Sequence, residues 1–239
     1  MTTSWDDGHA LDMKLAAMLA RHGVPGTFYV PRQCEGRALL GRDELQQLAQ
    51  GFELGAHTLH HPRLTTLPDR EADSEIRGSR QYVEDITGRE CRVFAPPGGR
   101  FKQAHVRMAA EAGFRGFRTT ELLDYGMPRW RGGIAVLPTT LQAHVHPAAG
   151  YWRNAIRRMR LGHLLTWLRY GQGGLVGLFR SLLDRAIVQG GVVHLWGHSW
   201  EIEEHRAWPL LETMLMEINE RRSQLRFVAN SELCREAAR

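Results

Sequence analysis

Short hydrophobic segments with the spacing of β-strands alternate with helical segments along most of this chain, and this order limits the folds it can adopt. We expect strands at residues 1–7, 27–30, 52–56, 93–95, 116–120, 134–138, 192–195 and 225–228. We expect helices at residues 12–22, 43–49, 69–88, 103–112, 181–189 and 209–221. Such alternation predicts an α/β protein with a parallel sheet and outer helices, either a closed barrel or an open doubly wound sheet.

Size and composition are those of one ordinary globular domain. With 239 residues, 43% hydrophobic and 24% charged, the chain can bury a substantial core, so we expect a single domain over residues 1–239. Its three cysteines are widely spaced, which argues against a disulfide framework and fits a reducing compartment. Residues 1–20 lack the pattern of a secretory signal, and no apolar stretch is long enough for a membrane span. We therefore expect a cytoplasmic protein.

The segment 148–180 differs from the rest of the chain. It mixes tryptophan, leucine and isoleucine with many arginines, a basic amphipathic pattern within a chain of net charge +5. We predict a basic helical insertion that is either an arginine-rich solvent face or a patch for phosphate, nucleotide or anionic lipid headgroups. The second interpretation would allow peripheral membrane contact. No nucleic-acid-binding motif is present, so we expect no nucleic-acid partner.

Polar side chains follow four of the predicted strands. Asp6 and Asp7 end the first, His57 follows the third, residues 96–99 follow the fourth, and His198 follows the strand near residue 195. The carboxyl ends of parallel strands meet at one edge of a sheet or at one mouth of a barrel. The sequence therefore predicts one active site built from these segments.

The types of these side chains indicate metal-assisted hydrolysis. His57 and His61 are four residues apart and could present both imidazoles on one side, although each could also be an ordinary loop residue. Asp6 and Asp7 could form a simple turn, but neighbouring side chains diverge, so one carboxylate can bind a metal while the other transfers a proton. Three protein ligands leave one position for water, as in hydrolytic zinc sites.

The segment 194–201 adds two histidines and two tryptophans. Trp196 and Trp200 could form the wall of a pocket around His198. Alternatively, the tryptophans belong to the core and the histidines to the surface. The position of His198 directly after a strand favours the mouth of the barrel.

These motifs together resemble the polysaccharide deacetylase family, the nodulation-protein-B-like deacetylases of carbohydrate esterase family four. Residues 4–8 correspond to its T-F-D-D-G motif, 23–29 to G-V-P-A-T-F-F, 57–62 to H-S/T-x-x-H-P and 94–99 to F-A-x-P-x-G. His198 is the best match to the histidine that ends the family's last strand. The resemblance covers residues 4–100 with good specificity, and residues 121–190 match nothing in the family. It implies a single-domain distorted (β/α) barrel of seven parallel strands.

The resemblance also implies a role for each site residue. The metal ligands would be Asp7, His57 and His61. The general base would be Asp6, and the general acid His198, with His194 as the alternative acid. Thr58 would support the loop between the histidines, and the oxyanion and substrate would contact Gly98 N–H, Pro97 and Trp196. The metal would be one Zn²⁺, with Co²⁺, Ni²⁺ or Fe²⁺ as alternatives.

Two family features have no obvious counterpart. Ala95 stands where many members have an arginine that restrains the base, and three arginines could replace it: Arg92, Arg100 and Arg118. The acidic residue and tryptophan that orient the acid are not evident either, and three residues are options: Glu121, Asp124 and Trp130.

These features predict a metal-dependent hydrolase that removes an N-acetyl or N-formyl group from an amino sugar. Because we expect a cytoplasmic protein, the predicted substrate is a nucleotide- or lipid-linked precursor of surface polysaccharide, or another small glycoside. The basic segment 148–180 would suit a pyrophosphate. Two alternatives stay open: a metal-dependent amidase acting on a non-sugar C–N bond, and a catalytically inactive sugar-binding homologue.

Overall fold

The computed structural model describes residues 1–144, 168 and 173–237, and these residues contain one nine-stranded sheet. Its strands are β1 (Thr2–Asp6), β2 (Thr27–Val30), β3 (Glu53–Ala56), β4 (Val93–Phe94), β5 (Gly116–Arg118), β6 (Arg129–Arg131), β7 (Ile134–Leu137), β8 (Leu141–Gln142) and β9 (His194–Gly197). The strand order is β6-β7-β5-β4-β3-β2-β1-β9-β8. All neighbours pair in parallel except β6 and β7. The α/β prediction is confirmed, but the expected number of seven strands is wrong.

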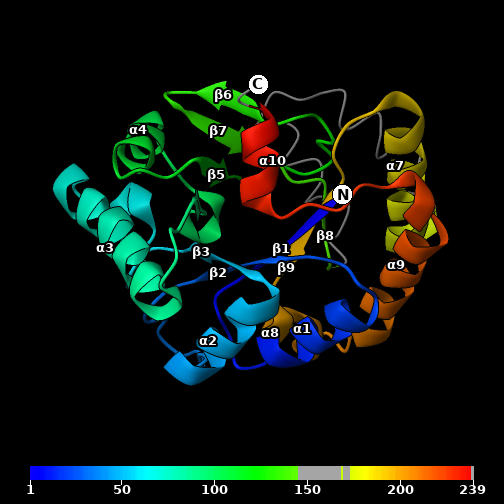
Figure 1. Cartoon of the computed structure of the whole chain (residues 1–239), viewed down its shortest axis with the longest axis horizontal. Helices are drawn as coiled ribbons and strands as arrows, with labels where there is room; N and C mark the ends of the chain where they lie inside the picture. Colours follow the sequence, from blue (N-terminus) through cyan, green and yellow to red (C-terminus); the bar gives the residue numbers. More distant parts are fainter. Residues whose placement is uncertain (145–167, 169–172, 238–239) are drawn as a thin grey trace.

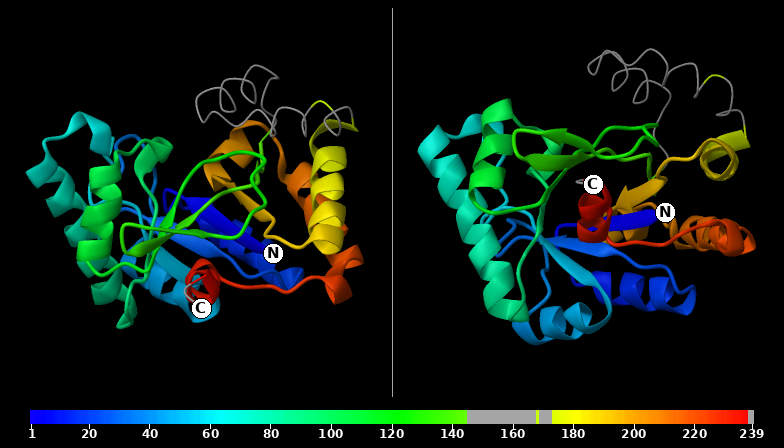
Figure 2. Two further views of the ribbon diagram at one scale, coloured as in Figure 1. Left: turned by 90° about the horizontal axis from the view of Figure 1, so that it is seen from above. Right: turned by 45° about the horizontal axis from the view of Figure 1, so that its top comes forward.

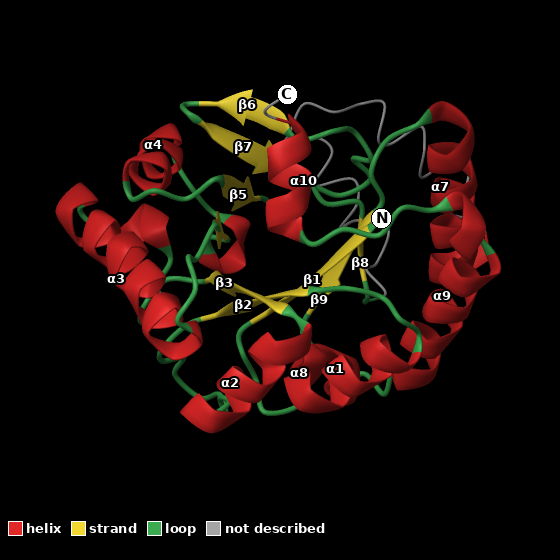
Figure 3. Ribbon diagram, in the orientation of Figure 1, coloured by secondary structure: helices red, strands yellow, loops and turns green. Residues whose placement is uncertain are grey.

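Helices surround the sheet, which curls into an incomplete barrel (Figures 1 and 3). They are α1 (Asp12–Arg21), α2 (Arg42–Gly51), α3 (Asp69–Thr87), α4 (Gln103–Glu111), α7 (Gly174–Gln189), α8 (Ser199–Glu204), α9 (Trp208–Glu220) and α10 (Asn230–Ala237). Figure 2 shows α3 and α4 together at one side of the sheet and α7 and α9 together at the other. Within the described residues β6 and β8 are the edge strands, so the barrel is not closed by pairing between them.

Strand β1, which has a neighbour on each side, shows why polar residues point to the inside of the curled sheet. Successive side chains of a strand alternate between its faces. Trp5 packs outward in the core beneath the helices, with Leu15 and Leu19 of α1. Ser4 and Asp6 face inward, where Ser4 Oγ lies 2.8 Å from His194 Nε2 and Asp6 pairs with Arg118. This alternation delivers Asp6 to the interior at the end of the strand.

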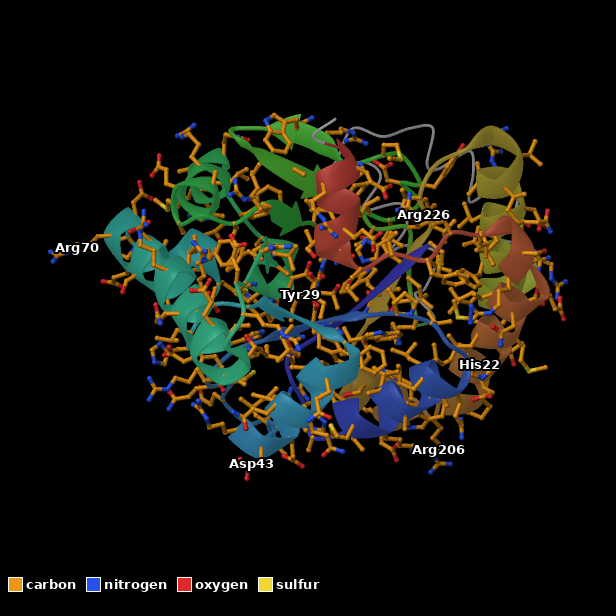
Figure 4. The ribbon with its side chains drawn as sticks, viewed as in Figure 1. His22, Tyr29, Asp43, Arg70, Arg206 and Arg226 are labelled. Atoms are coloured by element: carbon orange, nitrogen blue, oxygen red, sulfur yellow. The ribbon has the colours of Figure 1, made fainter. Side chains whose placement is uncertain are left out.

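The interior is closed on the side away from the site by α10. A second apolar cluster, separate from the one under the outer helices, includes Val93, Leu137, Leu233 and Cys234. Figure 4 shows Tyr29 of this cluster inside the curled sheet, whereas the side chains of exposed residues such as Arg70 project outward. Helix α10 therefore fills the space that the incomplete barrel leaves between β1, β5 and β7.

The expected strand at residues 225–228 is wrong. Two hydrogen bonds link these residues to the start of the chain, from Val228 N to Met1 O at 3.1 Å and from Met1 N to Arg226 O at 2.8 Å, but the residues join no sheet. The sequence also gave no indication of β6, β8, α8 and α10, since two to eight residues are too few to show a period.

The predicted basic insertion falls mostly outside the described residues, which omit 145–167 and 169–172. Residues 174–180 of it belong to α7. In the part of the chain that the structure describes, no helix combines the length and the apolar character needed to cross a membrane.

Candidate metal centre and active site

The carboxylate of Asp7 lies just beyond the end of β1 because the chain turns sharply there. Asp7 has a φ of 82° and Gly8 a φ of 60°. A Cβ added at Gly8 would lie 3.1 Å from Val30 Cγ1 of β2, and its positive φ already disfavours other residues. The turn places Asp7 at the mouth of the curled sheet.

Asp7, His57 and His61 form a compact cluster, as the sequence predicted. One donor atom from each lies within 4.8 Å of the other two. Asp7 Oδ1 is 3.1 Å from His61 Nε2 and 3.5 Å from His57 Nε2. His57 Nδ1 donates a hydrogen bond to the carbonyl oxygen of Ala95 at 2.7 Å, which leaves the lone pair of its Nε2 facing the cluster.

This donor set fits a divalent cation. One carboxylate and two imidazoles are a usual ligand set for catalytic zinc, and the backbone bond of His57 is the outer contact that fixes a ligating imidazole. Burial would raise the pKa of Asp7, but the adjacent rings of His57 and His61 hold it well below its usual range. The carboxylate is therefore ionised, the form that binds metal.

Backbone strain concentrates in these residues. Asp7, Thr58 and His61 all have positive φ, at 82°, 62° and 56°, and they are three of the five such non-glycine residues that the structure describes. Each such conformation costs of the order of 1–3 kcal/mol and persists where surrounding contacts impose it. Thr58 Oγ1 donates to the carbonyl oxygen of His57 at 2.5 Å, and its role in supporting the loop stays a prediction.

Glu75 of α3 holds the loop that carries the two histidines. Its Oε2 accepts hydrogen bonds from the backbone N–H groups of Leu59 and His60 at 2.9 and 2.8 Å. Its Oε1 lies 2.6 Å from His60 Nδ1, so His60 points away from the cluster. No sequence motif pointed to Glu75, because an acidic residue on an exposed helical face is ordinary.

Arg118 replaces the missing arginine of the third motif. It is fully buried, and its Nη2 donates to Asp6 Oδ1. The guanidinium lies between the rings of Tyr29 and Trp196, at 4.9 and 5.2 Å from their centroids. Of the three arginines considered from the sequence, the structure places Arg118 against Asp6, the predicted base, and Arg118 comes from β5 rather than from the third motif.

His198 is oriented by Glu201, which the sequence did not single out for this role. His198 Nδ1 lies 3.1 Å from Glu201 Oε2, and Gln142 Nε2 donates to the same oxygen at 2.7 Å. His198 Nε2 is 4.0 Å from Asp6 Oδ2. Burial would lower the pKa of His198, but the contact with Glu201 and the charges of Asp7 and Asp6 raise it, so the acid form is favoured.

The residues suggested earlier for this orienting role lie elsewhere. Glu121 and Asp124 both pair with Arg129, and the side chain of Trp130 is largely exposed. Glu201 is three residues after His198 in the sequence, at the start of a helix. The spacing of an acid three residues from a strand-end histidine was the signal that could have identified it.

His194 is a poor alternative acid. It is fully buried, its Nε2 meets Ser4 Oγ, and its Nδ1 donates to the carbonyl oxygen of Pro138 at 3.1 Å. Burial, together with the nearby charge of Arg118, lowers the pKa of His194 to about 3. The ring is therefore neutral near pH 7, and His198 is the better candidate.

The remaining predicted contacts surround the mouth. Pro97 and Gly98 follow β4 in a short 3₁₀ turn, and Gly98 adopts a φ of 61°. Trp196 is the penultimate residue of β9, and its ring centroid lies 5.6 Å from that of His198. The indole N–H of Trp196 is buried without a hydrogen-bond partner among the described residues. Their contacts with oxyanion and substrate stay predictions.

A groove of about 510 Å³ lies elsewhere, between the ends of α2 and α3 and the start of α10. Its acidic residues are already satisfied by the protein. Glu53 accepts hydrogen bonds from the hydroxyl of Thr27 and from the backbone N–H of Ser231. Glu90 forms an ion pair with Arg92. The chemistry of the donor groups therefore favours the mouth rather than this groove as the active site.

We expect Glu201→Gln to lower kcat by about 10–100-fold, since the acid would lose both its orientation and its ionic partner. Glu201 raises the pKa of His198, so its loss should lower that pKa and move the alkaline limb of the kcat/KM profile to lower pH. A pH–rate profile of both proteins measures this. An unchanged alkaline limb would contradict the assignment of His198 as acid.

A second pH effect concerns Asp12, whose two carboxyl oxygens are buried without a hydrogen-bond partner in the described chain. Burial raises its pKa from 3.8 to about 8, against a smaller opposing effect of Ser199. The folded state thus favours the protonated form of Asp12. The stability that this provides is fully present below pH 3.8 and is lost as pH rises through 8. In Asp12→Asn this side chain does not titrate. As pH rises from 3.8 to 8, the free energy of unfolding of the variant should therefore increase relative to that of the parent, by at most about 1.4 kcal/mol per pH unit. Urea unfolding at several pH values tests this, and parallel profiles would contradict it.

The curled parallel sheet and its cluster of two histidines and one aspartate define an α/β domain with a candidate metal centre of the hydrolytic type. Residues 1–117 match the family model described as polysaccharide deacetylase. This part of the chain is similar to that family, as its motifs predicted. It contains Asp6, Asp7, His57 and His61, whereas Arg118, His198 and Glu201 lie beyond it.

Two curated proteins of Bacillus subtilis (strain 168) are similar to this chain. The uncharacterized protein YlxY is 27% identical over 139 residues, 57% of this chain and 41% of that protein. The peptidoglycan-N-acetylmuramic acid deacetylase PdaA is 25% identical over 149 residues, 61% of this chain and 55% of that protein. The chain thus spans about half the length of these relatives.

The likeness in fold extends over the whole chain. A crystal structure from Mycobacterium smegmatis, assigned to the polysaccharide deacetylases, superposes with a TM-score of 0.72 at 15% identity. The match covers 99% of this chain and 90% of that one. At this identity the comparison shows the fold alone, and it agrees with the single curled α/β domain described above.

Proposed function

We propose that this protein is a metal-dependent hydrolase that removes an N-acetyl or N-formyl group from an amino sugar. One observation supports this proposal above all: three groups of side chains lie together at one mouth of the curled sheet. They are the Asp7–His57–His61 cluster, the Asp6–Arg118 pair and the His198–Glu201 pair. The match of residues 1–117 to the polysaccharide deacetylase family model and the similarity to a peptidoglycan deacetylase support an N-acylated sugar as substrate.

The three ligands would hold one divalent cation, for which zinc is the first choice. When bound, the cation would polarise the amide carbonyl and acidify a water molecule. Cobalt, nickel and iron stay alternatives because the ligand types alone do not select among them.

Asp6 is arranged to take the proton from that water. Its Oδ1 is engaged by Arg118, which fixes the carboxylate, and its Oδ2 faces His198 across 4.0 Å. Since Asp6 is nearly buried, proton transfer takes place away from bulk solvent. The pairing with Arg118 keeps the Asp6 carboxylate oriented.

His198 is arranged to protonate the departing amine. Glu201 accepts a hydrogen bond from His198 Nδ1. His198 Nε2 therefore presents its proton to the space beside Asp6. An amine is a poor leaving group, and acid assistance contributes about 10²–10⁴-fold. The backbone N–H of Gly98 and the indole N–H of Trp196 would contact the acyl oxygen or the sugar.

The test is incubation of the zinc-loaded protein with N-acetyl and N-formyl sugars, both free and nucleotide- or lipid-linked, while released acid is measured. Acid release from one of these sugars supports the proposal. Release only from non-sugar amides would make the protein an amidase of another class, and no release from any amide would favour an inactive sugar-binding homologue. The cytoplasmic location and a role of residues 148–180 stay predictions.

A further inference from the structure

The two carboxylate oxygens of Asp7 have different partners. Oδ1 lies 3.1 Å from His61 Nε2 and 3.5 Å from His57 Nε2. Oδ2 accepts a hydrogen bond from the indole N–H of Trp200, at 2.8 Å. Trp200 therefore holds the side of the carboxylate that faces away from the two histidines.

An indole suits this position because its N–H only donates. It can neither bind the cation itself nor accept a proton, so it does not compete with Asp7 for metal. A carboxylate with one oxygen tied in this way cannot rotate to exchange its two oxygens. Outer contacts of this kind typically change metal affinity by about 10–100-fold when they are removed.

Arg37 covers the outer face of the same indole. Its guanidinium carbon lies 3.4 Å from the centroid of the Trp200 ring. Arg37 belongs to the segment between β2 and α2, and among the described residues no carboxylate forms an ion pair with it. A cation on the ring face is attracted by its π electrons and draws electron density from the ring, which makes the N–H a stronger donor.

We propose that Trp200 is a positioning residue that selects Oδ1 of Asp7 as the metal ligand, and that Arg37 reinforces it by stacking on the face of the indole. The proposal rests on the proposed function only for the role of Asp7 as a ligand. Of the two residues, Trp200 lies outside the region that matches the family model, so it would be a determinant of metal affinity beyond that region.

The test is the zinc affinity of the metal-free protein, measured by competition with a chromogenic chelator and without any substrate. Trp200→Phe keeps an aromatic ring under Arg37 and removes the donor, and it should weaken zinc binding by about 10–100-fold. Arg37→Met removes only the charge and should weaken it about threefold.

Trp208 offers a matched control. Its indole N–H donates to Glu203, and Lys14 lies over its ring at 4.1 Å, so it repeats the arrangement at the surface and away from the cluster. Trp208→Phe should leave zinc affinity unchanged. Circular dichroism and thermal unfolding confirm that each variant is folded before its affinity is interpreted.

Zinc affinity of Trp200→Phe within twofold of the parent would overturn the inference. If that variant does not fold, Arg37→Met decides, and unchanged affinity there would overturn it instead. The zinc affinity of His57→Ala separates the two proposals: if that variant loses zinc and Trp200→Phe does not, only the role of Trp200 fails. If His57→Ala binds zinc as tightly as the parent, the proposed metal centre fails as well.

Discussion

Replacing His57 with alanine will remove the bound metal and reduce acid release to the background rate. His57 is fully buried, and its Nε2 faces Asp7 because its Nδ1 is held by the carbonyl oxygen of Ala95. Alanine takes away one of three ligands and leaves a cavity that no neighbouring donor fills. Since loss of an outer contact alone costs about 10–100-fold in affinity, loss of a ligand should cost more than about 100-fold.

Metal content after dialysis and the rate of acid release measure this effect together. His60→Ala is the matched control, because His60 belongs to the same loop but bonds Glu75 at the surface. That control should keep both metal and activity. If His57→Ala retained stoichiometric metal and normal activity, the assignment of the ligands would be wrong.

Asp6→Asn should abolish turnover and keep the metal. An asparagine amide cannot take a proton from water, so we expect kcat to fall by about 10²–10⁴-fold. Asp7, His57 and His61 remain in place, so metal content should stay that of the parent. The structure adds a second effect, because Arg118 would remain buried beside a neutral partner, and breaking a buried ion pair costs roughly 3–5 kcal/mol.

The double variant Asp6→Asn/Arg118→Met separates these two effects. It removes the unpaired cation, so stability should return toward that of the parent while turnover stays absent. A double-mutant cycle measures both effects. It compares the parent, the two single variants and the double variant by urea unfolding and by steady-state kinetics. Recovery of activity with stability would show that Asp6 acts only through the fold.

The sequence predicted the parts of this protein that depend on local pattern. Strand–helix alternation indicated the parallel sheet, and strand-end positions brought Asp7, His57 and His61 together before any geometry was known. Strand number was wrong because β6 and β8, of three and two residues, carry no periodicity, and because residues 225–228, expected as the last strand, join no sheet.

Contacts between distant segments could not be predicted in this way. Arg118 reaches Asp6 from a strand 112 residues away, and Trp200 reaches Asp7 across 193 residues. Glu201 was overlooked for another reason: its part in the site depends on α8 beginning directly after His198. Motifs thus identified the residues of the candidate metal cluster, whereas the side chains that contact them from distant segments depend on how the sheet curls.

The most direct test of the central claim is a crystal structure of the zinc-loaded protein with anomalous scattering recorded at the zinc edge. The account predicts one strong peak about 2.0–2.2 Å from Asp7 Oδ1, His57 Nε2 and His61 Nε2. A peak bound by other residues, or no peak at these three under saturating zinc, would contradict it.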